Sequence, residues 1–218
     1  MKKYTVEKYC SSSTYRWDII NHIISKNKFL NYLEIGVNDG ACIRRINAAH
    51  KDGVDPYPGS EHGFYMDIPE INYPITSDDF FSLIKNSDIK YDIIFIDGLH
   101  HSEQVDKDIE NSLNHIVDNG YIILHDCNPP EYEMQLVPRV TSMWNGDVWK
   151  SIVKLRCLKE DLEICVVDTD WGVGIVRKGK QSLYKKTSLD NCLTYEYLDE
   201  NRDDLLNIIS VEDFYLKY

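Results

Sequence analysis

The sequence lacks any long hydrophobic run. Its longest apolar stretches, residues 93–96 and 121–124, are only a few residues long, whereas a helix that crosses a bilayer needs about 20 apolar residues. The first 15 residues contain charges and a serine run where a secretory signal would need an apolar segment. We therefore expect a cytoplasmic protein that does not span a membrane.

Paired cysteines are absent as well. The six cysteines stand far apart and no two form a C-x-x-C pair, so the sequence has neither a zinc-knuckle pattern nor a dense disulfide framework. Basic residues are scarce, because 24 lysines and arginines face 36 acidic residues and the net charge is −12 at pH 7. That charge repels phosphate backbones and anionic lipids, which argues against a nucleic-acid or membrane partner.

No internal repeat, low-complexity tract or Pro/Gly-rich linker divides the 218 residues. With 43% hydrophobic and 28% charged residues, the composition is that of a globular protein with one sizeable core. We expect a single domain with its core at residues 31–178. A helical N-terminal extension, residues 1–30, and a C-terminal extension, residues 179–218, flank that core.

Short apolar runs typical of strands alternate with segments of helical periodicity. The expected strands are residues 32–35, 54–55, 73–76, 91–96, 121–124, 162–167 and 173–176. The expected helices are residues 41–50, 78–86, 103–116 and 137–158, with Ser77 as the cap of the second.

This alternation predicts an α/β fold with a doubly wound, mostly parallel sheet. The run at residues 92–97 is almost continuously apolar between its two acids, as in strands that helices cover on both faces. Only residues 168–172 separate the last two strands, so these should pair as an antiparallel hairpin. Ligands of such sheets bind at the carboxyl ends of the strands.

Polar residues follow the first expected strand. Gly36 and Gly40 have no Cβ atom and would let a ligand approach the backbone. Asn38 stands where the dinucleotide fingerprint requires glycine, and Glu34 and Asp39 add negative charge that suits a pyrophosphate poorly. A ligand with a cationic sulfonium, an ammonium group and a ribose diol suits this acidity better.

Acids and histidines follow three further strands. Asp55 stands about 20 residues after Glu34, where such folds place a ribose-binding acid, although an Asp-Pro turn explains it equally well. Residues 97–101, Asp-Gly-Leu-His-His, follow the fourth expected strand, and His125 with Asp126 follows the fifth. Their shared position at strand ends indicates a ligand site.

These motifs resemble class I S-adenosylmethionine-dependent methyltransferases. The resemblance is closer still to small bacterial O-methyltransferases associated with sugar and surface-polysaccharide genes. The motifs are YLEIGVNDG at residues 32–40, FIDGLHH at 95–101, HDCNPP at 125–130, WNGDVW at 144–149 and VDTDWG at 167–172. The resemblance implies a Rossmann-like methyltransferase fold with a seven-stranded sheet whose last strand is antiparallel, in agreement with the expected hairpin.

The resemblance also implies roles for individual residues. Glu34 and Gly36 would line the methionine end of S-adenosylmethionine, and Asp55 would hold its ribose hydroxyls. Ser77 and Asp78 would lie near the adenine. The other cofactor-binding residues that it implies are Asn38, Asp39, Gly40, Asp97 and His101.

Methyl transfer to a sugar hydroxyl needs a general base, a metal ion or both, because a hydroxyl is a poor nucleophile at neutral pH. By resemblance to metal-assisted sugar O-methyltransferases, Asp97 and Asp126 would be metal ligands and His100 the base, with Asp97 also part of the catalytic pair. His125 stands where that family has an acid, so it is a further candidate ligand and favours Mn²⁺, Fe²⁺ or Zn²⁺ over Mg²⁺. Three alternatives stay open: a site without metal, a helix cap for His101 and a core histidine for His125.

The acceptor site is less clearly marked. Trp144 can stack on a sugar ring, and Arg139 or Asp147 can bind its polar groups, although tryptophans are equally common in cores. Our hypothesis is an O-methyltransferase that uses S-adenosylmethionine and acts on a carbohydrate, a nucleotide-sugar or another sugar-containing small molecule. The alternatives are an NAD(P)-dependent oxidoreductase and a non-catalytic cofactor- or sugar-binding module on the same fold. A homodimer is compatible with the sequence and is left open.

Overall fold

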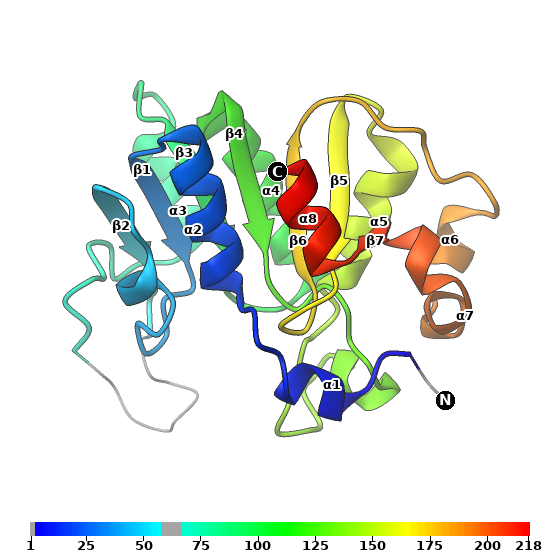
Figure 1. Ribbon diagram of the computed structural model, residues 1–218. Coiled ribbons are helices and arrows are strands. Elements are labelled where there is room, and N and C mark those ends of the chain that lie inside the picture. Colours follow the sequence, from blue (N-terminus) through cyan, green and yellow to red (C-terminus); the bar gives the residue numbers. More distant parts are fainter. Residues whose placement is uncertain (1–2, 58–66) are drawn as a thin grey trace.

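The computed structural model describes residues 3–57 and 67–218. A seven-stranded sheet lies between two layers of helices (Figure 1). The strands are β1 (Asn31–Ile35), β2 (His50–Val54), β3 (Tyr91–Ile96), β4 (Ile116–Leu124), β5 (Leu162–Val167), β6 (Val173–Lys178) and β7 (Ile208–Ile209). The helices are α1 (Val6–Cys10), α2 (Arg16–Asn27), α3 (Ser77–Ile84), α4 (Ser102–His115), α5 (Trp149–Leu158), α6 (Leu189–Cys192), α7 (Tyr195–Leu205) and α8 (Val211–Lys217), with 3-10 turns η1 (Ile43–Arg45) and η3 (Tyr132–Gln135).

The strand order is β2-β1-β3-β4-β6-β5-β7. Strand β6 runs antiparallel to both β4 and β5, and the other neighbouring pairs are parallel. The short connection after β5 forces the hairpin, in which Val167 pairs with Val173. The predicted doubly wound, mostly parallel α/β sheet with an antiparallel strand is therefore confirmed.

Alternation of side chains along the strands builds one core on each face of the sheet. Helices α2 and α8 lie on the face turned toward the viewer in Figure 1, where Tyr32 of β1 belongs to the same cluster as Ile23 and Phe214. Leu33, the next residue of β1, joins Phe80 of α3 on the other face, which α3, α4 and α5 cover. Because helices cover both faces, the central strands are apolar along their length.

Two expected strands differ from the structure. Residues 73–76 do not form a strand, because only Tyr73 bridges to Val54 of β2 before α3 begins. The seventh strand is instead β7, which pairs with Val166 and Val167 at the edge of the sheet. A strand of two residues leaves no periodic pattern, so it could not be predicted from the sequence.

Two expected helices are also wrong in extent. The helix at residues 41–50 is reduced to η1, because the Asn21 side chain binds the Arg45 carbonyl oxygen (2.8 Å) and the Asn47 amide (2.8 Å), groups that a continuing helix would use. The helix at residues 137–158 begins only at Trp149. The Asn-Gly pair that ends at Gly146, with φ of +62°, lies in the loop before it.

The carboxyl ends of β1, β2, β3 and β4 meet at the lower edge of the sheet, next to the N-terminal segment (Figure 1). The expected cap of α3 also changes there, since the Thr76 side chain, rather than that of Ser77, accepts the hydrogen bond from the Asp79 amide. Within the described parts of the chain, no helix has the length and apolar character to cross a membrane.

Candidate active site

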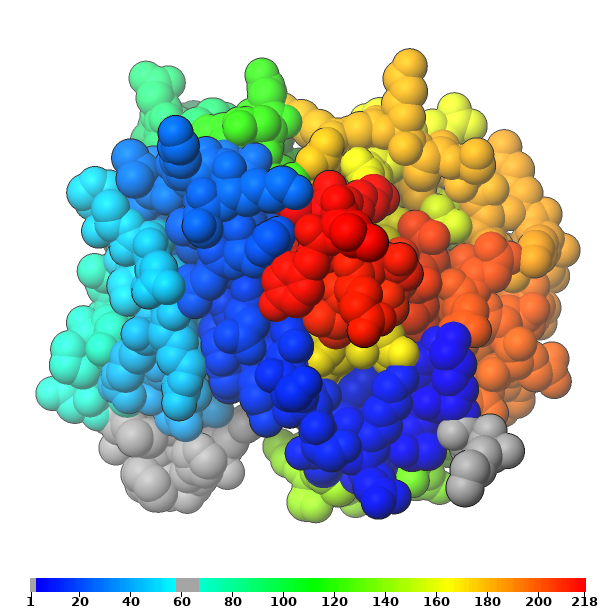
Figure 2. Space-filling view, in the orientation of Figure 1, coloured from blue at the N-terminus to red at the C-terminus, as the bar shows by residue number. Residues whose placement is uncertain are grey.

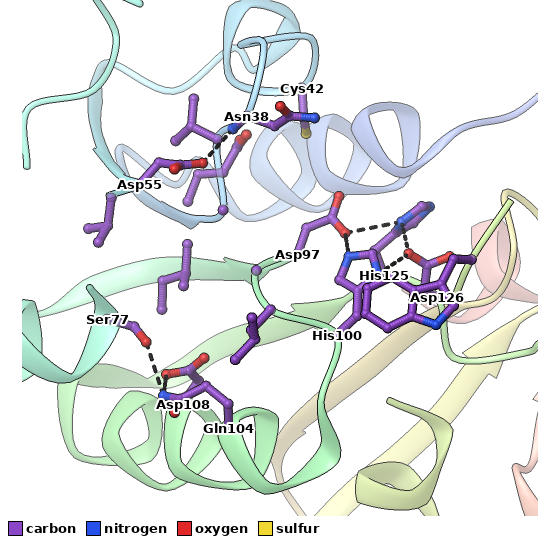
Figure 3. Close-up of a pocket in the computed structure, with 18 of the residues that line it drawn as sticks. Asn38, Cys42, Asp55, Ser77, Asp97, His100, Gln104, Asp108, His125 and Asp126 are labelled. Atoms are coloured by element: carbon purple, nitrogen blue, oxygen red, sulfur yellow. Dashed lines mark hydrogen bonds and ion pairs between the residues drawn. The ribbon is translucent and has the colours of Figure 1, made fainter. Parts of the chain in front are cut away.

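A cavity of about 740 Å³ opens at the carboxyl ends of the strands. One half is lined by the loops after β1 and β2 and by the start of α3, and the other by the loops after β3 and β4 and by residues 134–145. Figure 3 shows the side chains of both halves pointing into this cavity. Of the residues expected from sequence, all but Gly40, His101 and Asp147 line it.

Glu34 is a fully buried acid at the end of β1. The Tyr32 hydroxyl donates a hydrogen bond to its Oε2 (2.5 Å), while Oε1 has no hydrogen-bond partner among the described residues. Burial raises the pKa of Glu34 to about 8, because a carboxylate loses its hydration there. An acid with one unpaired oxygen in a cavity wall is suited to a cationic ligand group.

Gly36 lets two loops of the site approach closely. Its φ is +87°, and a Cβ atom at this position would lie 2.2 Å from the Asp97 carbonyl oxygen. A side chain would therefore push the loop after β1 away from the loop after β3. Gly40 also has a positive φ, +78°, but it packs against the Arg44 side chain rather than against the cavity.

Asp55 organises the loop that faces it. Its Oδ2 accepts a hydrogen bond from the Asn38 amide (2.7 Å), and its Oδ1 accepts one from the Tyr57 amide (2.8 Å). The second bond is the turn that the sequence offered as an alternative, and ribose binding by Asp55 stays a prediction. Asp39 lines the same wall of the cavity.

A polar group closes the far end of this half, where Figure 3 shows Ser77, Gln104 and Asp108 together. Gln104 Nε2 donates to Ser77 Oγ (3.2 Å), Asp78 Oδ1 (2.9 Å) and Asp108 Oδ1 (3.1 Å). Burial raises the pKa of Asp108 to about 6. Sequence reasoning missed Gln104 and Asp108, although their i, i+4 spacing places them on one face of α4.

Two acids and two histidines meet in the other half and form what we call the acid–histidine cluster: Asp97, His100, His125 and Asp126 (Figure 3). His100 Nε2 lies 3.1 Å from Asp97 Oδ1, and its Nδ1 lies 3.4 Å from Asp126 Oδ2. His125 Nδ1 lies 3.3 Å from Asp97 Oδ1 and 3.1 Å from Asp126 Oδ2. Each imidazole thus touches both carboxylates.

Within the acid–histidine cluster, Asp97 and the histidines shift each other's pKa toward the charged form. Burial alone would raise the pKa of Asp97, but His125 and His100 hold it well below its usual range. Burial likewise opposes protonation of the histidines, yet Asp126 and Asp97 raise the pKa of both rings. Asp97 stays ionised and the imidazoles become stronger bases.

Backbone geometry fixes two members of the acid–histidine cluster. His100 and Asp126 have φ of +58° and +59°, a left-handed conformation that residues with a side chain rarely adopt. Gly146 allows this for His100, because a Cβ atom there would lie 1.9 Å from the His100 carbonyl oxygen. The Trp144 ring stacks on the His100 ring with centroids 5.4 Å apart.

Arg16 is a functional candidate that sequence reasoning missed. It begins α2, within the segment taken as an extension, and still lines the cavity beside the acid–histidine cluster. Its Nη1 donates to Asp170 Oδ2 (3.1 Å), and its Nε lies 3.6 Å from Asp97 Oδ2. No local pattern in the sequence indicates that Arg16 contacts Asp97 and Asp170, which lie far away along the chain.

Two of the expected site residues do not line the cavity. Asp147 was expected to face the acceptor, but its carboxylate accepts hydrogen bonds from the Ser102 amide (2.6 Å) and hydroxyl (3.0 Å) at the start of α4. His101 was expected near the cofactor, with a helix cap as the alternative; it occupies the N-cap position of α4 without a side-chain cap hydrogen bond, and its ring meets Trp144 edge-on. Arg139 and Trp144 do line the cavity, with the guanidinium 5.6 Å from the indole ring.

The donor set fits a divalent cation. The ligand atoms of Asp97, His100 and Asp126 all lie within 4.8 Å of one another. Asn145, which is 1% exposed, donates to Asp126 Oδ1 (2.5 Å), and its own Oδ1 has no hydrogen-bond partner within the described part of the chain. Carboxylates and an amide oxygen suit Mg²⁺ or Mn²⁺, and an imidazole nitrogen favours Mn²⁺ of the two.

This chain is similar to known proteins in the sequence of one segment and in its fold. Residues 33–127 match the model of a family described as a methyltransferase domain. No curated protein sequence matches the chain. The matched segment contains the loops after β1, β2 and β3 and ends just after Asp126.

Two solved structures share the fold. PaMTH1, a methyltransferase of Podospora anserina with bound S-adenosylhomocysteine, is 14% identical over 76% of this chain and 78% of its own, with a TM-score of 0.53. TomG, an O-methyltransferase of tomaymycin synthesis from Streptomyces achromogenes in complex with S-adenosylmethionine, is 11% identical over 73% and 78%, with a TM-score of 0.50. The chain thus contains a segment that matches a methyltransferase domain, and it shares the fold of these two methyltransferases, in agreement with the enzyme class expected from the sequence.

Proposed function

We propose that this protein transfers the methyl group of S-adenosylmethionine to a hydroxyl of a carbohydrate or another sugar-containing small molecule, with His100 as the general base. The observation that carries the proposal is the acid–histidine cluster, which lies in the same cavity as Glu34 and Asp55. A donor bound in one half would present its methyl group to an acceptor in the other.

The cofactor half supports this orientation of the donor. Glu34 Oε1 offers an unpaired acceptor to the ammonium group, and Asp55 stands at the end of β2 for the ribose. Ser77 and Asp78 line the end where the adenine would lie. Negative charge along this wall attracts the positive sulfonium ion and disfavours the pyrophosphate of NAD(P).

The reaction is an in-line displacement. The acceptor oxygen forms a bond to the methyl carbon while the carbon–sulfur bond breaks. The electron pair of the broken bond stays on the sulfur of S-adenosylhomocysteine. His100 takes the hydroxyl proton, and Asp97 and Asp126 stabilise the resulting imidazolium ion. A base whose pKa is raised by two carboxylates accepts that proton readily.

A divalent cation, Mg²⁺ or Mn²⁺, is part of the proposal. Asp97 and Asp126 would hold it, and His125, whose Nδ1 lies 3.3 Å and 3.1 Å from their oxygens, would take the place of His100 as the third ligand, so that His100 stays the base. When bound, the cation would lower the pKa of the acceptor hydroxyl. Trp144 and Arg139 supply an aromatic face and a cation for a sugar ring and its polar groups.

The His100→Ala variant tests the proposed base. We expect methyl transfer to an acceptor from a sugar and nucleotide-sugar panel to fall at least about 100-fold, the usual contribution of a general base, with the affinity for S-adenosylhomocysteine within about threefold of wild type. His50→Ala, which removes an exposed histidine at the far end of β2, is the matched control. Unchanged turnover in His100→Ala would exclude His100 as the base.

The Asp55→Ala variant tests the donor site. We expect the affinity for S-adenosylmethionine, measured by calorimetric titration, to fall about 10- to 100-fold, as for other hydrogen bonds to a charged group. Asp118→Ala, an exposed acid of β4, should bind as wild type does. NAD(P) is titrated in parallel, and binding of NAD(P) instead of S-adenosylmethionine would favour the oxidoreductase alternative.

A further inference from the structure

The N-terminal segment, residues 4–16, is bound tightly to the loops beside the acid–histidine cluster. Lys8 Nζ pairs with Asp168 Oδ2 (2.5 Å), and the Tyr9 hydroxyl donates to Asp168 Oδ1 (3.1 Å). Asn128 Nδ2, from the loop after β4, donates to the Tyr9 hydroxyl (2.5 Å). Figure 2 shows this segment in dark blue across the lower edge of the molecule, next to the yellow residues of the hairpin.

Arg16 ends that segment, and its position is fixed from two sides. Its backbone amide donates to Asp170 Oδ2 (2.8 Å), and Nη1 donates to the same oxygen (3.1 Å). Nη1 also lies 3.2 Å from His125 Nε2, and the side chain is only 19% exposed. Asp170 therefore anchors a buried guanidinium against the acid–histidine cluster.

Arg16 and the two histidines contact different oxygens of the Asp97 carboxylate. Its Nε lies 3.6 Å from Asp97 Oδ2, whereas Oδ1 faces His100 (3.1 Å) and His125 (3.3 Å). The carboxylate cannot rotate freely when each oxygen has its own cationic or donating neighbour. Arg139, the other arginine of the cavity wall, is exposed and donates to the carbonyl oxygens of Thr141 and Ser142.

We propose that Arg16 is a resident counter-cation of the acid–histidine cluster, which fixes Asp97 and weakens the binding of a divalent cation there. The inference rests on the cation site of the proposed function. A guanidinium and a dication that share one carboxylate repel each other, and in a partly buried site that repulsion is screened little. Arg16 is therefore a positioning residue that sets how readily the site takes up metal.

The test is calorimetric titration of Mn²⁺ into the full-length protein and its variants. We expect Arg16→Gln to bind Mn²⁺ roughly tenfold more tightly than wild type, because a positive charge next to the site is removed. Arg16→Lys keeps the charge and should stay within about threefold of wild type. Arg45→Gln is the matched control, since Arg45 packs on the same Trp17 ring but is exposed and outside the cavity.

Unchanged or weaker Mn²⁺ binding by Arg16→Gln overturns the proposal, and so does an equal gain in Arg45→Gln. If Arg16→Gln is unfolded without metal, recovery of the wild-type circular dichroism spectrum in millimolar Mn²⁺ supports the proposal and no recovery overturns it. Binding of S-adenosylhomocysteine is measured on the same samples. Its absence in wild type would count against the proposed function and would leave the Mn²⁺ comparison valid.

Discussion

At the scale of single residues, folding changes the ionisation of Glu34. Its side chain is fully buried, and one oxygen accepts a hydrogen bond from the Tyr32 hydroxyl while the other has no hydrogen-bond partner in the described chain. Burial raises its pKa from 4.5 to about 8. The free protein therefore keeps Glu34 largely protonated at neutral pH, and a bound cation would favour its ionised form.

This shift predicts a pH dependence of stability. Between pH 4.5 and 8 the unfolded chain has released the Glu34 proton while the folded chain keeps it, so the contribution of Glu34 to stability is full below pH 4.5 and is lost as pH rises through 8. In Glu34→Gln this contribution is constant. The free energy of unfolding in urea, measured at pH 5 and pH 8, should fall more in wild type than in the variant, and equal falls would contradict the assignment.

At the scale of elements, the start of α4 connects the base to the rest of the fold. His100 and the N-cap residue His101 lead into this helix, and Asp147 from a distant loop accepts hydrogen bonds from Ser102. The Asp147 amide in turn donates to the His100 carbonyl oxygen (3.2 Å). A loop before α5 thus supplies the cap that the local sequence of α4 lacks.

Asp147→Ala should therefore act on stability. We expect the free energy of unfolding to fall by about 1 kcal/mol, as for the loss of a helix cap. Asp161→Ala, which removes an exposed acid just before β5, should change it by less than about 0.5 kcal/mol. Chemical denaturation of both variants checks this, and a large rise in acceptor KM with unchanged stability would restore the role expected from the sequence.

Local patterns explain which elements were predictable. Strands β3, β5 and β6 and the second half of β4 are mostly apolar runs, so the sequence indicated these strands and the polar residues that follow β3 and β4, Asp97 and Asp126. Expectations failed where distant side chains act on the backbone, as Asn21 does on the residues around η1. Arg16 and Asp108 were missed for the same reason, because only the folded chain brings them to the cavity.

At the scale of the whole molecule, the C-terminal residues are part of the core. Leu198, Leu205 and Phe214 are fully buried, and Arg202 donates to Asn128 Oδ1 (2.6 Å) in the loop after β4. Helix α8 covers the sheet beside α2 (Figure 1). That the chain folds as a single domain remains a prediction, and these contacts support it.

Two substitutions in α8 test that prediction. We expect Phe214→Ala to lower the free energy of unfolding by about 3–5 kcal/mol, because it leaves a cavity in the core. Leu216→Ala, at a side chain that is 83% exposed, should cost less than about 0.5 kcal/mol. Thermal unfolding followed by circular dichroism should show one transition in each, and a separate early transition in Phe214→Ala would indicate an independent C-terminal unit.

The stacking of Trp144 on His100 gives the molecule an optical property. An imidazolium ion accepts an electron from an excited indole more readily than a neutral imidazole does, so the emission of Trp144 should dim when His100 takes up a proton. The two rings are nearly parallel, at 25°, and close enough for that transfer. The protein therefore carries its own fluorescent indicator of the charge on the candidate base, readable without a label.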